Sequence, residues 1–548
     1  MEERLIQITE IIKSMPEVTI NIPFIQLMNG DITGSFTFKE GGIELSFDLT
    51  INMFYPFQFH NNESIKFSNE DLVKYNHVMK DGSICIHTSH SPNLKDKLYY
   101  DFDSLRNWIK KYYIGKENDY NYEHIIVPTK SFKGINFCYL FTEVEHEFKP
   151  IEFGYTNYSF LNQGLHNENK INTYIIQSFE LGQKTFPSKW NDIYKKRETG
   201  TGVYIFIGNA PVTNGRFAVE KWNELEPYVN QAFMQLLKNV GRDVEKNNVQ
   251  EPLPLFFGYN IPGGEIHWEC AAIEVNNFPI TERKVPNSRI YEIHFKDEEI
   301  NWLQTKNSSY KYFFGRGTLS KKIIDKKILI IGIGAIGSNL ATTLVRGGCT
   351  DIHLADYDIK EPENVCRSEY QFFSGLNSKV IDLGRQLSDI SPFVNPKPFE
   401  RLTDVIKFLI SNGFEKKETI ERLDEYDYIF DCSTDNDLAY ILDSLNLKAE
   451  VINISITNHA KELVCAIKPN LYECMNEIFK GLNSDENDLY NPTGCWSPTF
   501  KASYNDIASM TQIAIKHINI LLEKNLSLRS FYLQAGNESE LNFKIHQF

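Results

Sequence analysis

The stretch KILIIGIGAIGSNLATTLVRGGCTDIHLADYDIKEPENVCR, residues 327–367, decides the fold of this chain. Residues 327–332 are an apolar run that predicts a buried strand, and a helical pattern follows it. Between the two, Gly332, Gly334 and Gly337 spell G-x-G-x-x-G. Glycines there permit a tight turn and let the backbone approach phosphate oxygens at the start of the helix. The context predicts a Rossmann-like α/β domain that binds a dinucleotide or ATP.

The residues beyond the second strand distinguish a site for ATP from a site for a dinucleotide. Asp356 ends the strand DIHLAD, where a carboxylate would hold ribose hydroxyls in either case. Asp358, Asn364 and Arg367 have no use in hydride transfer. They suit ATP, because Asn and Arg can hold polyphosphate oxygens and Asp can hold Mg²⁺. ATP with Mg²⁺ is therefore the expected ligand, and NAD-dependent oxidoreduction is the alternative.

Two further positions extend this pattern towards the C-terminus. Lys379 in GLNSKV is another candidate phosphate partner. The strand YDYIF then runs into Asp431-Cys-Ser-Thr-Asp435-Asn436. A carboxylate at such a strand end lies in the crevice of a parallel sheet, so Asp435 is the expected metal ligand.

This order of motifs resembles the ThiF/MoeB superfamily of ubiquitin-activating-like adenylyltransferases over about residues 310–515. Two details differ from the family pattern: Ser368 replaces a glutamine, and one residue is inserted before Asp435. The resemblance implies a homodimer in which an arginine of one protomer reaches the site of the other. Arg316 in FFGRGTLS is the candidate, and a plain linker arginine is the alternative reading.

The first segment, residues 1–150, has its own site candidate. Residues 1–15 read as an amphipathic helix, and strand-like runs and an aromatic-rich helix follow. Cys85 ends the segment DGSIC, just after the turn signal Asp81-Gly82. On spacing alone, a lone cysteine in this position is most simply a half-buried strand residue.

The order Glu40-Gly41-Gly42, Tyr55-Pro56-Phe57 and DGSIC resembles a ubiquitin-conjugating enzyme over residues 20–115. That resemblance implies that Cys85 is an acceptor thiol. The family has His-Pro-Asn where this chain has Tyr75-Asn76-His77, so His77 replaces the asparagine that serves the oxyanion. An imidazole N–H could do the same work, or another residue could. His87 and His90 could tune the thiol or could be solvated loop residues.

Residues 151–305 read as an α+β middle domain without a catalytic constellation, which we interpret as a connecting or dimer-forming module. Its strands include GVYIFIGNA and PLPLFFGYN, and its helical pattern is expected to end at Gly241. Residues 306–548 then complete the adenylation domain. The expected fold class is α/β, with an α+β N-terminal ubiquitin-conjugating-like domain.

A second reactive thiol is expected after the adenylation site, because family members that pass an acyl group onward carry one there. Four cysteines qualify by position: Cys432, Cys465, Cys474 and Cys495. Cys432 lies inside a strand-end motif and Cys465 in an apolar strand pattern. Cys495 is surrounded by Gly, Pro and Asn ahead of a helix that begins near Asp506, a setting that suits a thiolate nucleophile.

Composition narrows the class of protein. The formal net charge of −15 and the lack of a Lys/Arg block argue against nucleic-acid binding. The sequence has no apolar run of about 20 residues and no signal-peptide pattern at its charged start, which predicts a cytoplasmic protein off the membrane. The nine cysteines contain no CxxC pair, so a disulfide framework or a four-cysteine zinc site is not expected.

The two halves together resemble the fused ubiquitin-transferase-like proteins of bacterial CBASS anti-phage systems. This resemblance implies that the C-terminal carboxylate of a cGAS-like nucleotidyltransferase, or a ubiquitin-like protein, is adenylated, passed to Cys495 and Cys85, and joined to a target lysine. Two alternatives remain besides oxidoreduction. They are activation of a sulfur carrier and an inactive scaffold that binds nucleotide and partners.

Overall fold

The computed structural model describes residues 2–58, 63–86, 88–117, 125–195, 199–247, 252–411, 416–482, 488–490, 499–536 and 542–548. Contacts divide the chain into two compact units, which are treated separately below. The first unit contains Met1–Phe137, Phe148–Gly154 and Gly202–Gln304, and the second contains Cys138–Glu147, Tyr155–Thr201 and Thr305–Phe548. None of the helices in these described ranges is long and apolar enough to cross a bilayer.

The first unit begins with a helix, an antiparallel four-stranded meander and a second helix. Their bounds are α1 Glu2–Lys13, β1 Val18–Gln26, β2 Ile32–Glu40, β3 Ile43–Ile51, β4 Ile65–Ser68 and α2 Leu94–Trp108. Phe36 of β2 contacts Phe47 and Phe67 of the neighbouring strands, and Phe36 and Phe67 meet Phe102 of α2, with ring centroids 5.1–5.8 Å apart. The expected helices and strands of this segment are confirmed.

The remainder of the first unit is a mixed sheet with a covering helix. β12 (Leu253–Ile261) runs parallel to β9 (Gly200–Gly208) and antiparallel to β13 (Glu265–Ile273). The apolar residues of α3 (Gln231–Asn247) pack in the same core as the inner face of this sheet. The other elements are η3 Trp222–Tyr228, β10 Val212–Thr213, β11 Phe217–Ala218, β14 Ile280–Lys284, β15 Tyr291–Phe295 and β16 Asn301–Asn307.

One expectation for this region is wrong, because α3 does not end at Gly241. The helix starts only at Gln231, since the preceding turns form a 3₁₀ segment that contains Pro227. It then continues through Gly241 to Asn247. A Cβ at Gly241 would lie 3.1 Å from the Phe278 ring. The glycine therefore serves close packing inside the helix and is not a stop signal.

The second unit carries a doubly wound sheet. Its order is β21-β18-β17-β22-β23-β24-β25-β26, parallel over the first five strands and antiparallel over the last three. The strands are β17 Ile328–Ile331, β18 Ile352–Ala355, β21 Lys397–Phe399, β22 Tyr428–Asp431, β23 Glu450–Ile456, β24 Glu462–Ile467, β25 Phe531–Ala535 and β26 Phe543–Gln547. The strand order reverses between β17 and β22, where such sheets bind their ligands.

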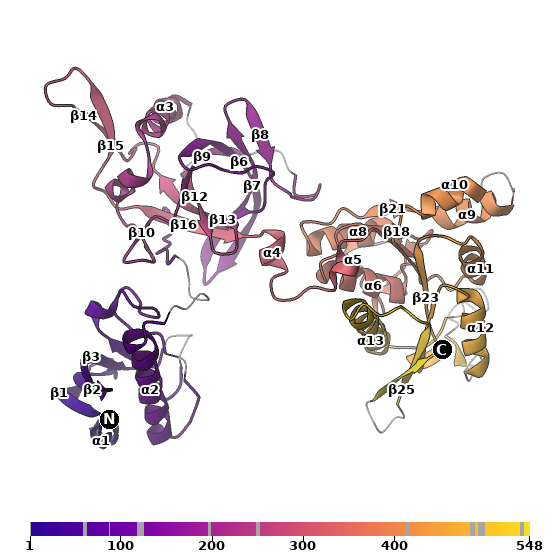
Figure 1. Ribbon diagram of the computed structural model, residues 1–548, viewed down its shortest axis with the longest axis horizontal. Helices are drawn as coiled ribbons and strands as arrows, with labels where there is room; N and C mark the ends of the chain where they lie inside the picture. Colours follow the sequence, from indigo (N-terminus) through magenta and orange to yellow (C-terminus); the bar gives the residue numbers. More distant parts are fainter. Residues whose placement is uncertain are drawn as a thin grey trace. The chain divides into compact units, whose positions relative to one another are not determined.

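Helices cover both faces of this sheet and give it two cores (Figure 1). α6 (Ala335–Arg346), α8 (Lys379–Ile390) and α13 (Tyr504–Glu523) share one core with alternate strand residues such as Ile328 and Ile330. α9 (Leu402–Ser411), α11 (Asn436–Ser444) and α12 (Leu471–Gly481) share the other core with Leu329 and Ile331. The expected Rossmann-like C-terminal domain is confirmed.

The remaining elements lie mainly in the second unit, and the first four of them belong to a different sheet from the doubly wound one. They are β5 Asn136–Phe141, β6 Glu152–His166, β7 Asn169–Leu181, β8 Lys184–Pro187, α4 Tyr310–Phe313, α5 Lys321–Ile324, β19 Ile359–Lys360, α7 Pro362–Val365, η4 Phe372–Ser374, β20 Asn377–Ser378 and α10 Lys416–Leu423. After β8, the Asn191 side chain donates to the carbonyls of Ser388 and Ser391, 3.1 and 3.0 Å away. These bonds tie that segment to the end of α8.

Candidate active site

The glycine turn after β17 packs directly on the turn after β22. Gly332 has φ +76°, and a Cβ there would lie 2.5 Å from the Cα of Ser433. A Cβ on Gly337 would lie 2.1 Å from the Gly332 carbonyl oxygen. A Cβ on Gly334 would meet nothing within 4 Å. The first and third glycines therefore close the turn, while the second borders open space.

That open space is a cavity of about 230 Å³ at the carboxyl ends of β17, β18 and β22. The predicted residues that line it are Gly332, Gly334, Asp356, Asp358, Arg367, Lys379 and Asp435. An adjoining cavity of about 770 Å³ shares Asp358, Arg367 and Lys379 and adds Asn364. The structure thus gathers residues that lie up to about 100 positions apart in the sequence around one connected space.

Backbone amides fix Asp356 in this cavity. Its Oδ2 accepts from the Ile333 amide at 2.8 Å and its Oδ1 from the Asp358 amide at 2.9 Å. Burial raises the pKa of the Asp356 carboxyl, against the positive charge of Lys379, which lowers it. The ammonium of Lys379, a buried residue, lies 2.9 Å from the Asp358 carboxylate. A nucleotide here would meet oriented carboxylates and a held cation.

Arg367 lines this space and binds the chain that follows residues 491–498. Its guanidinium donates to the Phe500 carbonyl at 3.0 Å and to the Thr499 hydroxyl at 2.8 Å, and it lies 5.3 Å from the centre of the Phe500 ring. The backbones of Tyr490 and Thr499 exchange two hydrogen bonds, of 2.9 and 3.0 Å. Cys495 itself lies outside the described residues.

Asp435 is the N-cap of α11 and already faces a cation. One carboxylate oxygen accepts from the Leu438 amide at 3.1 Å, and the other lies 2.6 Å from the ammonium of Lys407 on α9. Sequence reasoning missed Lys407, because a single lysine on an amphipathic helix carries no local signal of this contact. Asn364, in contrast, uses its side-chain oxygen within α7 to accept from the Glu361 amide at 3.0 Å.

The donor chemistry of Asp435 fits Mg²⁺. Carboxylate oxygens are ligands that Mg²⁺ prefers, and Mg²⁺ commonly takes one or two carboxylates with phosphates and water. The described ranges contain no cluster of three or more His, Cys, Asp or Glu residues that could hold a metal alone. A site with one or two carboxylates next to the glycine turn matches a cation that arrives with a nucleotide.

Burial argues against the three other cysteines that are candidates for the nucleophile predicted at Cys495. Cys432, Cys465 and Cys474 are all buried, and burial raises the pKa of each thiol. A thiol with a raised pKa is a poor nucleophile near neutral pH, because only the thiolate attacks.

Arg316 lies exposed between α4 and α5.

In the first unit, Cys85 is half-buried and follows the turn as expected. Its amide donates to the carbonyl of His77 at 2.8 Å, which brings these two residues together. His77 has φ +60°, and its ring lies 4.7 Å from the Tyr112 ring. The imidazole therefore packs against Tyr112, in the segment that follows α2. His87 lies outside the described residues, while the ring of His90 is 5.7 Å from that of Phe57.

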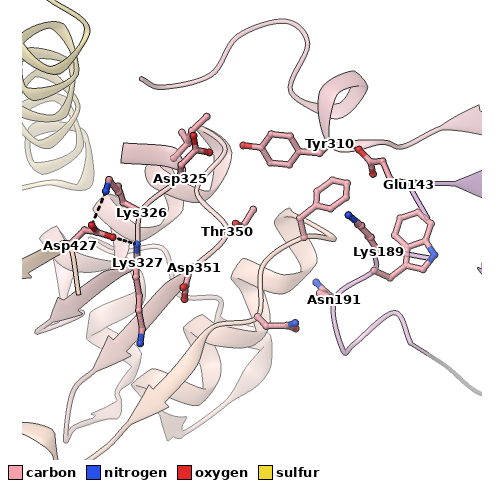
Figure 2. A pocket seen from close by; sticks show the side chains of 14 residues that line it. Glu143, Lys189, Asn191, Tyr310, Asp325, Lys326, Lys327, Thr350, Asp351 and Asp427 are labelled. Carbon is pink, nitrogen blue, oxygen red and sulfur yellow. Dashed lines mark hydrogen bonds and ion pairs between the residues drawn. The ribbon is translucent and has the colours of Figure 1, made fainter. Parts of the chain in front are cut away.

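A cavity of about 720 Å³ occupies the other end of the parallel sheet (Figure 2). Its lining includes Lys326 and Lys327 at the amino end of β17. Asp427 binds both: its carboxylate lies 2.8 Å from the Lys326 ammonium and accepts from the Lys327 amide at 3.0 Å. The Lys327 ammonium lies 2.8 Å from the Glu425 carboxylate, which is outside the lining. The glycine turn is at the opposite end of the sheet, and the predicted nucleotide ligands line the cavities there.

Comparisons with known proteins identify several similar proteins and one family. The ThiF family matches residues 309–536. The ATP-dependent ubiquitin transferase-like protein Cap2 of Enterobacter hormaechei subsp. hoffmannii (strain UCI 50) is 26% identical over 362 residues, which are 60% of this chain and 58% of that protein. The adenylyltransferase and sulfurtransferase UBA4 of Lodderomyces elongisporus is 28% identical over 134 residues, 24% of this chain and 27% of that protein.

Among solved structures, E. coli MccB is similar with a TM-score of 0.30 and 14% identity, covering 41% of this chain and 63% of that one. This chain spans less than two thirds of the length of each of these relatives. The family match lies on the same residues as the glycine turn and the cavities. Residues 309–536 are therefore similar to the ThiF family.

Proposed function

We propose that this protein uses ATP to activate the C-terminal carboxylate of another protein and then conjugates it to a lysine. One observation carries the proposal. Asp356, Arg367, Lys379 and Asp435 meet around one cavity beside a glycine turn at the switch point of a parallel sheet. This set provides ribose, polyphosphate and metal ligands together, and a dehydrogenase has no use for the last two.

Each residue has a role in the adenylation step. Asp356, held by two backbone amides, binds the ribose, and the glycine turn at the start of α6 receives the phosphates. Arg367 and Lys379 stabilise the negative charge that develops as the substrate carboxylate attacks the α-phosphate. Mg²⁺ bound at Asp435 would neutralise phosphate charge and orient the leaving pyrophosphate. Asn364 and Asp358 border the adjoining cavity, where we place the substrate tail and the leaving group.

The acyl group then moves to thiols. The Cys495 thiolate attacks the acyl-adenylate and releases AMP, and Cys85 takes the acyl group by transthioesterification. An amine of a target lysine attacks the second thioester and forms an isopeptide bond. The position of Arg367 supports a transfer from the adenylate to Cys495. The arginine lines the cavity and also donates to Thr499 and Phe500, next to residues 491–498. His77, whose backbone adjoins Cys85, is the proposed oxyanion partner in the last step.

The substrate that we propose is the C-terminal tail of a cGAS-like nucleotidyltransferase of an anti-phage CBASS system, in the cytoplasm. The relative from Enterobacter hormaechei, named an ATP-dependent ubiquitin transferase-like protein, supports this class of reaction. A ubiquitin-like protein is the alternative substrate. We propose a homodimer as the working form, with Arg316 of one protomer serving the site of the other.

The test combines ATP–pyrophosphate exchange with non-reducing gels. The protein, Mg-ATP and a candidate tail should give tail-dependent exchange. Cys85→Ala should accumulate a thiol-sensitive adduct on Cys495. Cys495→Ala should form no such adduct on Cys85. Loading of Cys85 in the Cys495→Ala variant would disprove the relay, and a lack of tail-dependent exchange would disprove the adenylation.

A second candidate function is activation of a sulfur carrier. The similarity to an adenylyltransferase and sulfurtransferase favours it. It shares the adenylation step but needs no acceptor thiol in the N-terminal domain. Full turnover by Cys85→Ala in a sulfur-transfer assay would select it over conjugation.

A further inference from the structure

One loop of the Rossmann-like domain begins and ends at residues of the candidate site. It runs from Ile359, next to Asp358, to Ser378, next to Lys379, and it contains Asn364 and Arg367. β19 and β20 pair antiparallel and close its two ends. The geometry of this loop therefore sets the distances between four of the candidate nucleotide and tail ligands.

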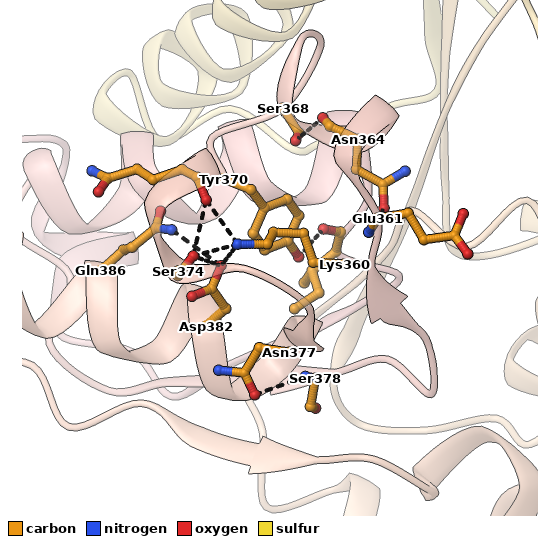
Figure 3. Close-up of polar contacts among 12 residues, drawn as sticks. Lys360, Glu361, Asn364, Ser368, Tyr370, Ser374, Asn377, Ser378, Asp382 and Gln386 are labelled. Atoms are coloured by element: carbon orange, nitrogen blue, oxygen red, sulfur yellow. Dashed lines mark hydrogen bonds and ion pairs between the residues drawn. The ribbon is translucent and has the colours of Figure 1, made fainter.

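A buried ammonium lies inside the loop (Figure 3). Lys360 is 2% exposed, and its Nζ donates to the Gln371 carbonyl at 2.7 Å, to the Ser374 hydroxyl and to the Asp382 carboxylate at 3.0 Å. A lysine ammonium has three N–H donors, so all three find an acceptor. Asp382 is 1% exposed and also accepts from Ser374 at 3.0 Å.

The outer half of the loop has little apolar anchoring of its own. Tyr370 is buried and donates to the Ile333 carbonyl at 2.7 Å, which holds the first half. Beyond it, Phe372, Phe373 and Leu376 are 75%, 100% and 69% exposed. Packing of these side chains therefore cannot hold this stretch, and the polar cluster around Lys360 does so.

Burying an ion pair is costly, and well-packed apolar residues in its place are often neutral or stabilising. A pair in this place is better explained by the geometry that it imposes than by added stability. Asp382 stands on α8, one turn after Lys379. The pair thus joins the loop that carries Asn364 and Arg367 to the helix that begins with Lys379.

We propose that Lys360 and Asp382 are positioning residues of the adenylation site, which hold the loop of residues 359–378 in the form that binds the polyphosphate. They touch neither nucleotide nor tail; they act through Asn364, Arg367 and Lys379. This proposal rests on the proposed function, because it concerns ATP binding at the same site.

The experiment compares Lys360→Met, Asp382→Leu and the double variant in the full-length protein. Each single variant leaves one buried charge unpaired and should lower the melting temperature. The double variant should melt close to the wild type. Its KM for ATP in tail-dependent pyrophosphate exchange should nevertheless rise about 10-fold or more, because small misplacements of positioned groups cost up to about 100-fold. Direct calorimetry should show the same loss of Mg-ATP affinity.

A matched control is the Lys97→Met, Asp101→Leu double variant. This pair on α2 is also buried, with side chains 8% and 0% exposed, but it belongs to the first unit. It should leave Mg-ATP affinity unchanged. Ser374→Ala serves if the first double variant does not fold: it removes one acceptor of Lys360 and should raise the KM for ATP about 2- to 5-fold at an unchanged melting temperature.

The outcomes separate the two proposals. Wild-type protein that binds no Mg-ATP would overturn the proposed function itself. A wild type that binds Mg-ATP, together with a folded Lys360→Met, Asp382→Leu variant of the same affinity, would overturn only the positioning role. If that variant does not fold, an unchanged KM for ATP in Ser374→Ala overturns it equally.

Discussion

At the scale of single residues, burial decides which thiols can react. Cys349 is fully buried, and burial raises its pKa to about 12. The pKa values of Cys432 and Cys465 are raised by the same cause. Since the thiolate is the nucleophile, a raised pKa leaves a smaller reactive fraction at any pH below it. Cys366 is exposed and Cys85 half-buried, so access does not protect them.

This contrast predicts a labelling pattern. With iodoacetamide at pH 8, Cys366 and Cys85 should be alkylated at least about ten times faster than Cys349, Cys432 and Cys465 in the folded protein. Raising the pH should keep increasing the alkylation rates of the buried thiols, because their pKa values lie above the ordinary range for cysteine. Peptide mass spectrometry over time measures this, and urea-unfolded protein is the control in which the differences vanish. Fast labelling of Cys432 in the folded state would contradict it.

The loss of Arg367 should slow the adenylation step. In the proposed mechanism its guanidinium stabilises the charge that develops at the α-phosphate, so Arg367→Ala should lower tail-dependent pyrophosphate exchange about 100- to 1,000-fold. Lys326→Ala, at the opposite end of the sheet, is the matched control and should stay within about twofold of the wild type. An Arg367→Ala enzyme as fast as its control would remove this residue from the mechanism.

At the scale of elements, the junction of β17 and β22 depends on glycine in two different ways. At Gly332 a side chain would overlap Ser433 and take a left-handed φ, so the two strand ends could not approach as they do. At Gly334 a side chain would enter open space in the cavity. The same kind of residue thus protects the fold in one position and the ligand space in the other.

The two positions give a paired prediction. Gly332→Ala should destabilise the domain by about 2 kcal/mol or more, from overlap and backbone strain together. Gly334→Ala should melt like the wild type yet lose Mg-ATP affinity. Thermal unfolding and calorimetry on both variants measure this. Equal melting temperatures for the two variants would refute the distinction.

The sequence predicted the elements around the site well, because its signals are local. The glycine pattern needs only a strand and a helix beside it, and the carboxyl ends of parallel strands must share one edge, which brings Asp356 and Asp435 together. Lys407 and Lys360 could not be found this way. Their partners, Asp435 and Asp382, lie on other elements, and only the packing of helices on the sheet shows the contacts.

The one misplaced helix end has the same cause. Gly241 reads as a stop signal locally, but its missing side chain is needed for the contact with Phe278, 37 positions further along. Cys495 remains a prediction from composition and resemblance, supported by the burial of Cys432, Cys465 and Cys474.

At the scale of the whole molecule, two groups of exposed apolar side chains lie in the second unit. Phe372, Phe373 and Leu376 gather on the loop of residues 359–378, and Tyr312 and Phe313 are exposed four residues or fewer before Arg316. Exposed apolar clusters of this kind favour protein contacts. A second copy of the chain is the partner that the homodimer proposal requires.

Subunit mixing tests that arrangement. Arg316→Ala and Asp435→Asn should each be inactive alone. Mixed dimers hold one site with an intact Asp435 and a partner's Arg316, so random exchange should restore about a quarter of wild-type pyrophosphate exchange. A mixture of Arg316→Ala with Arg367→Ala should regain pyrophosphate exchange in the same way. The double variant Arg316→Ala, Asp435→Asn, taken through the same subunit exchange alone, should stay inactive. Activity of Arg316→Ala alone would place this arginine outside the mechanism, and an inactive Arg316→Ala whose mixture does not recover would place it in its own site.

The Asp435 carboxylate, the proposed Mg²⁺ ligand, lies 2.6 Å from the ammonium of Lys407. A Mg²⁺ ion that binds there, as we propose, would have to displace this ammonium and so exchange one cation for another. The lysine would then compete with the metal and raise the Mg²⁺ concentration at which the site fills. Lys407→Met should reach half-saturation with Mg²⁺, at fixed ATP, at a concentration lower by up to about fivefold, as expected for a partly exposed pair. Titration of pyrophosphate exchange with Mg²⁺ measures this threshold, and a higher requirement in the variant would make the lysine a helper of the metal instead of its rival.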